Sequence, residues 1–375
     1  MLNASTHGTP GRSSFAEALR FAFSRWRVSI AVLFPAAILA RALDLAPLLV
    51  FSAAALALIP LASLLGDATE QVAAHAGAAA GGLLNATLGN LTELVIGVVA
   101  LWSGQVEVVK ASIAGSIVGE LLLVFGLSAL VGGVGREKLR FNTAAVGANV
   151  SMLFLAVVAL VMPALFQLFG SPRYFAVSSS ASGVDRLSLW AAVILLGVYG
   201  ASLVFTFRTH RSLFRGAGFA PPILGRGAAL AMLGVAAGLT VIASEILVGE
   251  VEPVTRSLGW SQMFVGMIIV ATVGNAAEHS AAVMLARRDE MDLALNIAIG
   301  SSAQIALFVA PLLVLLSQVR PPAMSLVFHP LETAAVIISV AVVTAASIDG
   351  ETNWFEGLQL LAVYAILAVV FYFLP

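Results

Sequence analysis

Two stretches of the sequence repeat one arrangement of amide, carboxyl and hydroxyl side chains. A shift of 185 residues superimposes six positions without a gap, pairing Gly89 with Gly274, Asn90 with Asn275, Glu93 with Glu278, Glu107 with Asp292, Gly115 with Gly300, and Ser116 with Ser301. Six such matches rarely arise by chance, so the chain contains an internal repeat. A looser pair of sites, Thr69-Glu70 and Ser244-Glu245, lies outside these stretches.

The repeated residues are oxygen donors at a spacing that suits a hard cation. Asn90 and Glu93 are three residues apart and share one face of a helix, as do Asn275 and Glu278. The glycine before each asparagine permits an unwound turn with free carbonyl groups. Ca²⁺ takes roughly six to eight oxygen ligands, whereas Zn²⁺ and Cu²⁺ favour His and Cys. The pattern therefore predicts Ca²⁺ ligands among the two glutamates, the two amides and the hydroxyls of Ser116 and Ser301.

These acids stand in apolar surroundings without a basic partner in their own segments. A charged side chain at the centre of a membrane helix costs roughly 2.5 to 3.5 kcal/mol. The carboxylates must therefore be neutralised, either by protons or by a cation. Because two carboxylates balance one divalent ion or two protons, Ca²⁺ and H⁺ are expected to compete for the same oxygens, which is the physical basis of antiport.

The composition requires that a lipid bilayer surround these segments. Of 375 residues, 60% are hydrophobic and only 10% are charged, and the mean hydropathy is +1.01. We predict an all-α polytopic membrane protein with eleven transmembrane helices. The apolar runs fall at residues 29–43, 46–66, 83–102, 111–134, 143–169, 187–207, 227–249, 262–286, 293–317, 326–347 and 355–374.

Basic residues predict the orientation and a division into two halves. About two thirds of the 19 Lys and Arg residues fall on one side if the N-terminus is cytoplasmic, which favours N-in and C-out. The inside turn at 348–353 carries no basic residue and is the exception. We expect the following division: a polar, amphipathic segment at 1–28, an extra helix at 29–43, a first five-helix repeat at 44–207, a basic cytoplasmic linker at 208–226, and a second five-helix repeat at 227–375.

The two repeats are expected to have opposite orientations in the membrane. The helices that carry Glu93 and Glu278 are the third and the eighth, so an odd number of crossings makes them antiparallel. Inverted repeats of this kind are typical of secondary transporters, whose sites lie near the bilayer midplane at interrupted helices.

The two motifs, GNLTELVIGVVALWSGQVEVVKASIAGSIVGELLLVFG and GNAAEHSAAVMLARRDEMDLALNIAIGSSAQIALFVAP, resemble the signature repeats of the calcium/proton exchanger (CAX) family of the cation/calcium exchanger superfamily. The resemblance covers the chain from about residue 27. It implies eleven helices, arranged as one extra helix plus two groups of five, and Ca²⁺ export from the cytoplasm in exchange for H⁺. It also implies that Glu93 and Glu278 are the main ion-binding acids, that His279 lies beside the pathway, and that the pathway is lined by Asn90, Asn275, Ser116, Ser301 and Gln304.

Two features depart from that family. Glu120 stands where the family usually has Asn, and this added acid is a candidate for binding protons, changing the stoichiometry or altering the choice of ion. The linker between the halves is basic, whereas the family often has an acidic helix there, so no regulatory role of that helix is carried over to this chain. Glu70 and Glu245 are candidates for a proton or gating route, with membrane-end acids as the alternative reading.

Other functions are left open at this stage. Exchange of Na⁺ for Ca²⁺, or of H⁺ for another cation such as Na⁺, K⁺ or Mn²⁺, is the first alternative, and a passive cation channel is a less favoured one. An intramembrane metalloprotease is remote because the sequence has no H-E-x-x-H motif, so no enzyme and no resident cofactor are expected. The formal net charge of −1 gives no reason to expect nucleic acid. The expected partners are the lipid bilayer, in a bacterial cytoplasmic membrane, and the transported Ca²⁺ and H⁺, with homo-oligomerisation left open.

Overall fold

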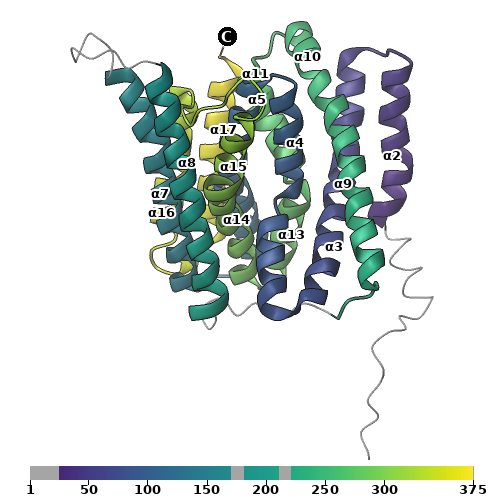
Figure 1. Cartoon of the computed structure of the whole chain (residues 1–375). Helices are drawn as coiled ribbons and strands as arrows, with labels where there is room; N and C mark the ends of the chain where they lie inside the picture. Colours follow the sequence, from purple (N-terminus) through teal and green to yellow (C-terminus); the bar gives the residue numbers. More distant parts are fainter. Residues whose placement is uncertain (1–24, 170–180, 211–220, 375) are drawn as a thin grey trace, which may run out of the picture.

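The computed structural model describes residues 25–169, 181–210 and 221–374, and it is almost entirely helical (Figure 1). The first half contains α2 (Arg25–Ala42), α3 (Pro47–Leu88), α4 (Leu91–Trp102), α5 (Val106–Val118), the π-helical turn η1 (Gly119–Val124), α6 (Phe125–Gly133), β1 (Leu139–Arg140), α7 (Thr143–Phe169), α8 (Ala181–Val204) and η2 (Phe205–Thr209). Most of the predicted N-terminal segment and residues 211–220 of the predicted linker lie outside the described residues.

The second half contains a similar series of helices and the other short strand. Its elements are α9 (Arg226–Gly249), α10 (Val251–Leu258), α11 (Gln262–Phe264), η3 (Val265–Val270), α12 (Ala271–Gly274), α13 (Ala276–Arg287), α14 (Met291–Gln304), η4 (Ile305–Val309), α15 (Ala310–Ser317), α16 (Pro330–Ala346), β2 (Glu351–Thr352) and α17 (Trp354–Tyr372). The all-α membrane fold is therefore confirmed, and each predicted apolar run coincides with helical structure.

The helices differ in how clearly they qualify as membrane spans. Within the described residues, seven helices are long and apolar enough to cross a bilayer, and two bent helix pairs pass the same test together. Two shorter apolar helices, Ser29–Ala42 and Pro330–Ala346, correspond to the remaining predicted runs.

The two bends occur at the repeated Gly-Asn pairs. The axis turns by 41° between the end of α3 and α4, and by 60° between α12 and α13. Asn90 and Asn275 leave the helical conformation, with φ/ψ of −89°/28° and −94°/4°. The prediction of an unwound turn was therefore right in position but wrong in detail, because Gly89 itself stays helical at φ −56° and ψ −44°.

Helix α3 is longer than expected. The predicted connector between residues 66 and 83 is helical apart from a break at Gly77, whose φ of +79° lies in the left-handed region that favours glycine. An Ala-rich sequence fills this segment, and alanine has the highest helix propensity, so the chain continues as helix where low hydropathy predicted a connector.

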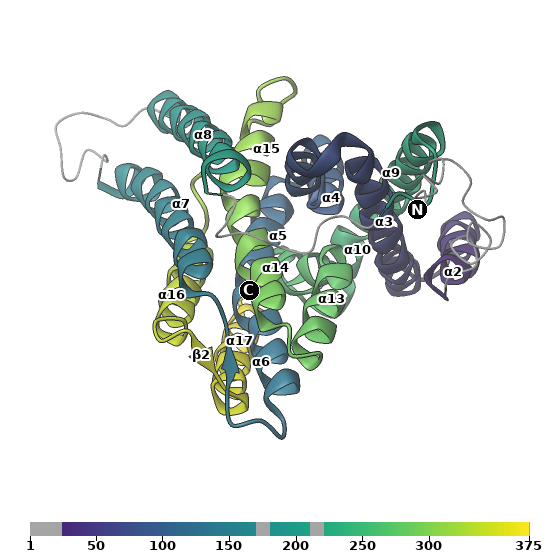
Figure 2. The ribbon, with the colours of Figure 1, turned by 90° about the horizontal axis from the view of Figure 1, so that it is seen from below.

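The apolar interior is divided into two clusters. The larger cluster draws on α4 to α8 and α13 to α17. The smaller cluster draws mainly on α2, α3, α9 and α10, which we call the small bundle, with one residue each from α4 and α5 and two from η3. Figure 2 shows α2, α3 and α9 on one side of the molecule and α7, α8 and α16 on the other. The arrangement suits a body that can shift as a unit against a larger one.

The short strands connect the α6–α7 loop to the α16–α17 loop. β1 and β2 are antiparallel, with Arg140 opposite Glu351. The Glu351 carboxylate accepts from Lys138 at 2.9 Å and from Arg140 at 3.2 Å. The hydrogen bond from Lys138, aided by both positive charges, holds the pKa of Glu351 below its usual value. The 348–353 turn, which has no basic residue of its own, thus lies beside basic residues of another loop.

Candidate functional site

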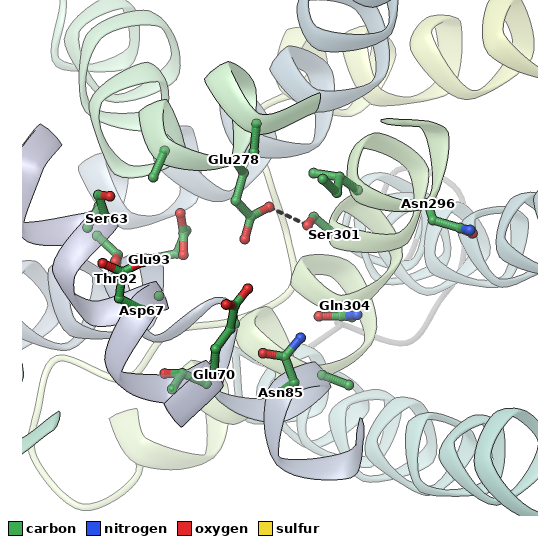
Figure 3. Close-up of a pocket in the computed structure, with 18 of the residues that line it drawn as sticks. Ser63, Asp67, Glu70, Asn85, Thr92, Glu93, Glu278, Asn296, Ser301 and Gln304 are labelled. Atoms are coloured by element: carbon green, nitrogen blue, oxygen red, sulfur yellow. Dashed lines mark hydrogen bonds between the residues drawn. The ribbon is translucent and has the colours of Figure 1, made fainter. Parts of the chain in front are cut away.

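A cavity of about 480 Å³ lies where the two bent helices meet α3 and α14 (Figure 3). Its lining includes four acids: Asp67 and Glu70 from α3, Glu93 from α4 and Glu278 from α13. Among the residues that the structure describes, no lysine, arginine or histidine lines it. The cavity extends from the two bends toward Leu285 and Leu293, which flank the α13–α14 turn.

The two predicted acids occupy equivalent positions and face this cavity. Glu93 and Glu278 each lie in the first turn of a helix that starts at a bend, and both are half-buried. A helix N-terminus favours a negative charge, so both carboxylates are placed where backbone dipoles support them. Ser301 on α14 donates a hydrogen bond to Oε2 of Glu278. Oε2 of Glu93 is buried and has no hydrogen-bond partner among the described residues.

The two asparagines lie behind the cavity wall and are held by their amide nitrogens. Nδ2 of Asn90 donates to Oε1 of Gln304 at 2.7 Å. Nδ2 of Asn275 donates to Oγ of Ser116 and to the carbonyl of Ala271, both at 2.8 Å. In both residues Oδ1 is buried and makes no hydrogen bond within the described structure. A buried carbonyl oxygen without a donor is costly, and a cation ligand role would satisfy it.

Of the polar residues expected to line the pathway, the structure places only some at this cavity. Gln304 and Ser301 line the cavity with the two glutamates, whereas Asn90, Asn275 and Ser116 do not. Ser116 is 3% exposed and serves as the acceptor for Asn275. The helix bends turn the asparagine side chains into the packing between the repeats, which a pattern of spacing along one helix cannot reveal.

Glu120 and His279 form a buried pair next to the cavity. Glu120 lies on η1 and is 0% exposed. Its Oε1 is 3.9 Å from Nε2 of His279, and its charge interacts with those of Glu278 and Glu93. Both of its carboxyl oxygens are fully buried, and the side chain lies next to Glu278. Glu120 thus faces the protein interior from the π-helical turn η1.

The remaining predicted acids, Glu70 and Glu245, line different cavities. Glu70 is exposed at the cavity, whereas Glu245 on α9 lines a separate pocket of about 420 Å³ with Trp102 and Arg320. Asp67 and Asn296 line the main cavity but escaped sequence analysis. Asp67 had a readable signal, since it precedes Glu70 by three residues and shares its helix face.

In the residues that the structure describes, no three His, Cys, Asp or Glu side chains are grouped closely enough to hold a metal ion. A cation in this cavity would therefore be bound by two carboxylates at most, completed by hydroxyl and amide oxygens and by water. Such a mixed oxygen set is the kind that Ca²⁺ accepts, because its coordination is flexible.

Comparisons with known proteins agree with this architecture. The model of the sodium/calcium exchanger protein family matches residues 46–208 and 228–373. The chain is 42% identical over 347 residues to the Ca²⁺/H⁺ antiporter of Synechocystis sp., covering 87% of this chain and 91% of that protein. It is 40% identical over 331 residues to the Ca²⁺/H⁺ antiporter ChaA of Bacillus subtilis, covering 86% and 92% of the two chains.

Solved structures give the same answer. The structure of native YfkE matches with a TM-score of 0.80 and 36% identity, covering 93% of this chain and all of that one. The H⁺/Ca²⁺ exchanger CAX matches with a TM-score of 0.69 at 16% identity, which supports the fold alone. The chain therefore belongs to the sodium/calcium exchanger protein family and, within it, to the calcium/proton exchanger family that its motifs resemble.

Proposed function

We propose that this chain is a secondary antiporter that exports Ca²⁺ from the cytoplasm in exchange for H⁺. The observation that carries the proposal is the pair of half-buried glutamates, Glu93 and Glu278, which face one cavity from two bent helices. The names of relatives such as the Synechocystis Ca²⁺/H⁺ antiporter support the choice of ions.

The chemistry follows from charge balance in the cavity. With four acids and no basic side chain in its lining, the cavity attracts cations. Glu93 and Glu278 together neutralise one Ca²⁺, and two protons neutralise them equally well when Ca²⁺ leaves. A site left with two bare carboxylates in the membrane interior is disfavoured, so the loaded and the protonated forms are the ones able to change access.

Each remaining polar residue has a place in this scheme. The Oδ1 atoms of Asn90 and Asn275 are available as further cation ligands. Hydrogen bonds from the Nδ2 atoms to Gln304 and Ser116 hold the two side chains in place. Ser301 orients Glu278 through its hydrogen bond. Glu120 and His279 tune the field at the site from behind it, since they do not line the cavity. Glu70 collects cations at the cavity, and Glu245 does so in the pocket beside Trp102.

The transmembrane arrangement we propose is eleven spans in two inverted repeats. The two bent pairs and the two shorter apolar helices join the seven long helices to make this number. The separate family matches at 46–208 and 228–373 support repeats at 44–207 and 227–375, joined by the 208–226 linker. With the N-terminus in the cytoplasm and the C-terminus outside, the cavity opens toward the cytoplasm of a bacterial cell, on the side of the Arg287–Arg288 turn.

Alternating access then requires the small bundle to move against the larger body. α3 supplies Asp67 and Glu70 to the cavity wall, whereas Glu278 and Ser301 stand on helices of the larger apolar cluster. A shift of α3 and α9 together would close this cavity and expose the opposite face of the same two glutamates.

Uptake of radioactive Ca²⁺ into everted membrane vesicles tests the function. We expect accumulation only when the vesicle interior is made acidic, and collapse on addition of a protonophore. Glu93→Gln or Glu278→Gln should abolish uptake while the protein still inserts and folds, because the amide mimics the protonated acid. Glu107→Gln is the matched control, since Glu107 has a 64% exposed side chain and lies outside the cavity.

The same assay separates the alternatives. Uptake driven by an imposed Na⁺ gradient instead of the pH gradient would identify a Na⁺/Ca²⁺ exchanger. Equilibration of Ca²⁺ down its own gradient, without dependence on either driver, would identify a channel. Proton-driven uptake that persists in either glutamine variant would disprove the shared carboxylate site.

A further inference from the structure

A second, smaller cavity lies beside the main one and is not used by the proposed cation route. This side chamber has a volume of about 140 Å³ and is lined by α7, α8 with η2, α14 and the end of α3. Half of its lining residues carry polar side chains, namely Asn149, Tyr199, Ser202, Thr206, Asn296 and Gln304. Tyr199 is buried and the other five are half-buried, so these polar groups lie largely within the packing of the helices.

The side chamber ends at the candidate ion site. Ala86, Asn296 and Gln304 line both the chamber and the main cavity. Oε1 of Gln304 accepts the hydrogen bond from Asn90, which lies three residues before Glu93. Gln304 is thus in contact with the site on one side and with the chamber on the other.

The lining of the side chamber suits water but not a calcium ion. A volume of this size can hold several water molecules, and its hydroxyl and amide groups provide the partners that such waters need. Within the described part of the chain, no acidic or basic side chain lines the chamber, in contrast to the four acids of the main cavity. Ca²⁺ would have to exchange most of its roughly six to eight oxygen ligands there without any charge to balance it. Protons, by contrast, can pass along hydrogen-bonded water.

Two contacts with the end of α3 close the chamber. The hydroxyl group of Tyr199 donates to the carbonyl oxygen of Ala86 at 3.1 Å. The ring of Phe207 packs over Gly82 so closely that a Cβ atom there would lie 2.3 Å from Cε1 of Phe207. Tyr199 on α8 and Phe207 on η2 therefore both touch the last turns of α3, the helix that must move when access changes. A displacement of α3 would break both contacts.

From this geometry we propose that the side chamber is a separate proton route, by which protons reach or leave the site while Ca²⁺ uses the main cavity. The proposal rests on the antiport function above. On the side of the main cavity, the O–H bonds of the protonated glutamates break, their protons pass to the chamber water, and the carboxylates bind the arriving Ca²⁺. The two ions then need not pass each other in one channel.

The decisive experiment compares two transport modes in proteoliposomes. Ca²⁺ uptake driven by a pH gradient needs proton movement, whereas exchange of radioactive Ca²⁺ for unlabelled Ca²⁺ at equal pH does not. Ser202→Leu places an apolar side chain in the chamber, and Asn149→Leu removes a polar group from the opposite wall. Each should lower proton-driven uptake by about tenfold or more while Ca²⁺/Ca²⁺ exchange stays within about twofold of wild type. Ser151→Leu, at an exposed position on α7 outside the chamber, is the matched control.

Every other result counts against the proton route. If both modes fall together in a folded variant, the chamber does not serve protons alone, and if neither falls, it serves no transport step. If Ser202→Leu does not fold, Asn149→Leu decides by the same criteria. Failure of wild type to show proton-driven uptake would instead contradict the proposed function itself.

Hydration of the chamber can be measured directly because the 375-residue chain has no cysteine. Ser202→Cys should react with a small, charged methanethiosulfonate reagent that requires water access. Ser188→Cys, on the same helix at a position that is 1% exposed and outside the chamber, should not react. Equal protection of both thiols would show that the chamber is dry and would overturn the proposal.

Discussion

Replacement of Gly115 by alanine should destabilise this protein, whereas the same change at Gly300, its repeat equivalent, should not. A Cβ atom at Gly115 would lie 2.1 Å from the carbonyl oxygen of Met267 and 2.6 Å from its carbonyl carbon. These are backbone atoms of η3, which cannot rotate away as a side chain can. At Gly300 the nearest atom would be Nδ2 of Asn149 at 3.7 Å, an ordinary van der Waals contact.

The expected magnitudes separate the two variants. Overpacking of an interior costs about 1–3 kcal/mol, and a clash with backbone falls at the upper end, near 3 kcal/mol. Alanine regains about 1 kcal/mol over glycine within a helix. The net effect of Gly115→Ala is then a loss of about 2 kcal/mol, while Gly300→Ala ranges from neutral to a gain of about 1 kcal/mol.

Thermal unfolding of the purified variants in detergent, followed by size-exclusion chromatography, measures this difference. The midpoint of Gly115→Ala should lie below that of wild type, and the midpoint of Gly300→Ala should lie at or above it. Shifts of the same sign and size in both variants would refute the close approach of α5 to η3 on which the reasoning rests.

Three further predictions concern single side chains. Glu120→Asn, which restores the usual family residue, should leave Ca²⁺ uptake intact but change its pH profile or its competition by Mn²⁺ and Na⁺; an unchanged profile would make Glu120 a bystander. The pKa of Glu351 is lowered from 4.5 in the folded state, so the stabilisation that its ionised carboxylate provides is present above pH 4.5 and is lost as the pH falls through the lowered pKa. The melting temperatures of wild type and Glu351→Gln should therefore differ at pH 7 and converge in acid. Arg41→Met leaves Glu250, which is 6% exposed, without its ion-pair partner and should cost about 1–3 kcal/mol in thermal unfolding, an effect that adding Glu250→Gln should largely reverse.

Much of the candidate site could be predicted because the repeat superimposes acidic side chains that are energetically costly within membrane helices. Glu93 and Glu278 were found from their spacing, and the structure places both at one cavity. The apolar runs located the helices because lipid permits few alternatives to a hydrogen-bonded helix. The prediction of a connector at 66–83 was wrong because the end of α3 depends on the helix propensity of this Ala-rich segment and not on its hydropathy.

Other features depend on how the helices pack, which a linear pattern does not contain. The burial of Glu120 results from the π-helical turn η1, and nothing in the spacing of Gly115 and Ser116 predicts it. The side chamber is formed by α7, α8 and α14, and its polar residues Asn149 and Ser202 belong to no repeated motif. Only their place in the lining of one cavity makes them a group.

The two repeats match in sequence, yet equivalent residues of the two repeats make different contacts in the structure. Asn275 bonds to Ser116 of the other repeat, whereas Asn90 bonds to Gln304 and not to Ser301. The backbone of Met267 packs on Gly115. Gly82, which corresponds to Met267 in the first repeat, packs on Phe207 instead.

If inverted repeats exchange conformations when access changes, Gly82 must leave Phe207 to approach Gly300, and Asn90 must leave Gln304 to reach Ser301. Both departures occur at the boundary between the main cavity and the side chamber. The step that exposes the glutamates to the opposite face of the membrane would therefore also remove the wall on which a separate proton route depends, so that protons and Ca²⁺ have distinct paths on one side only.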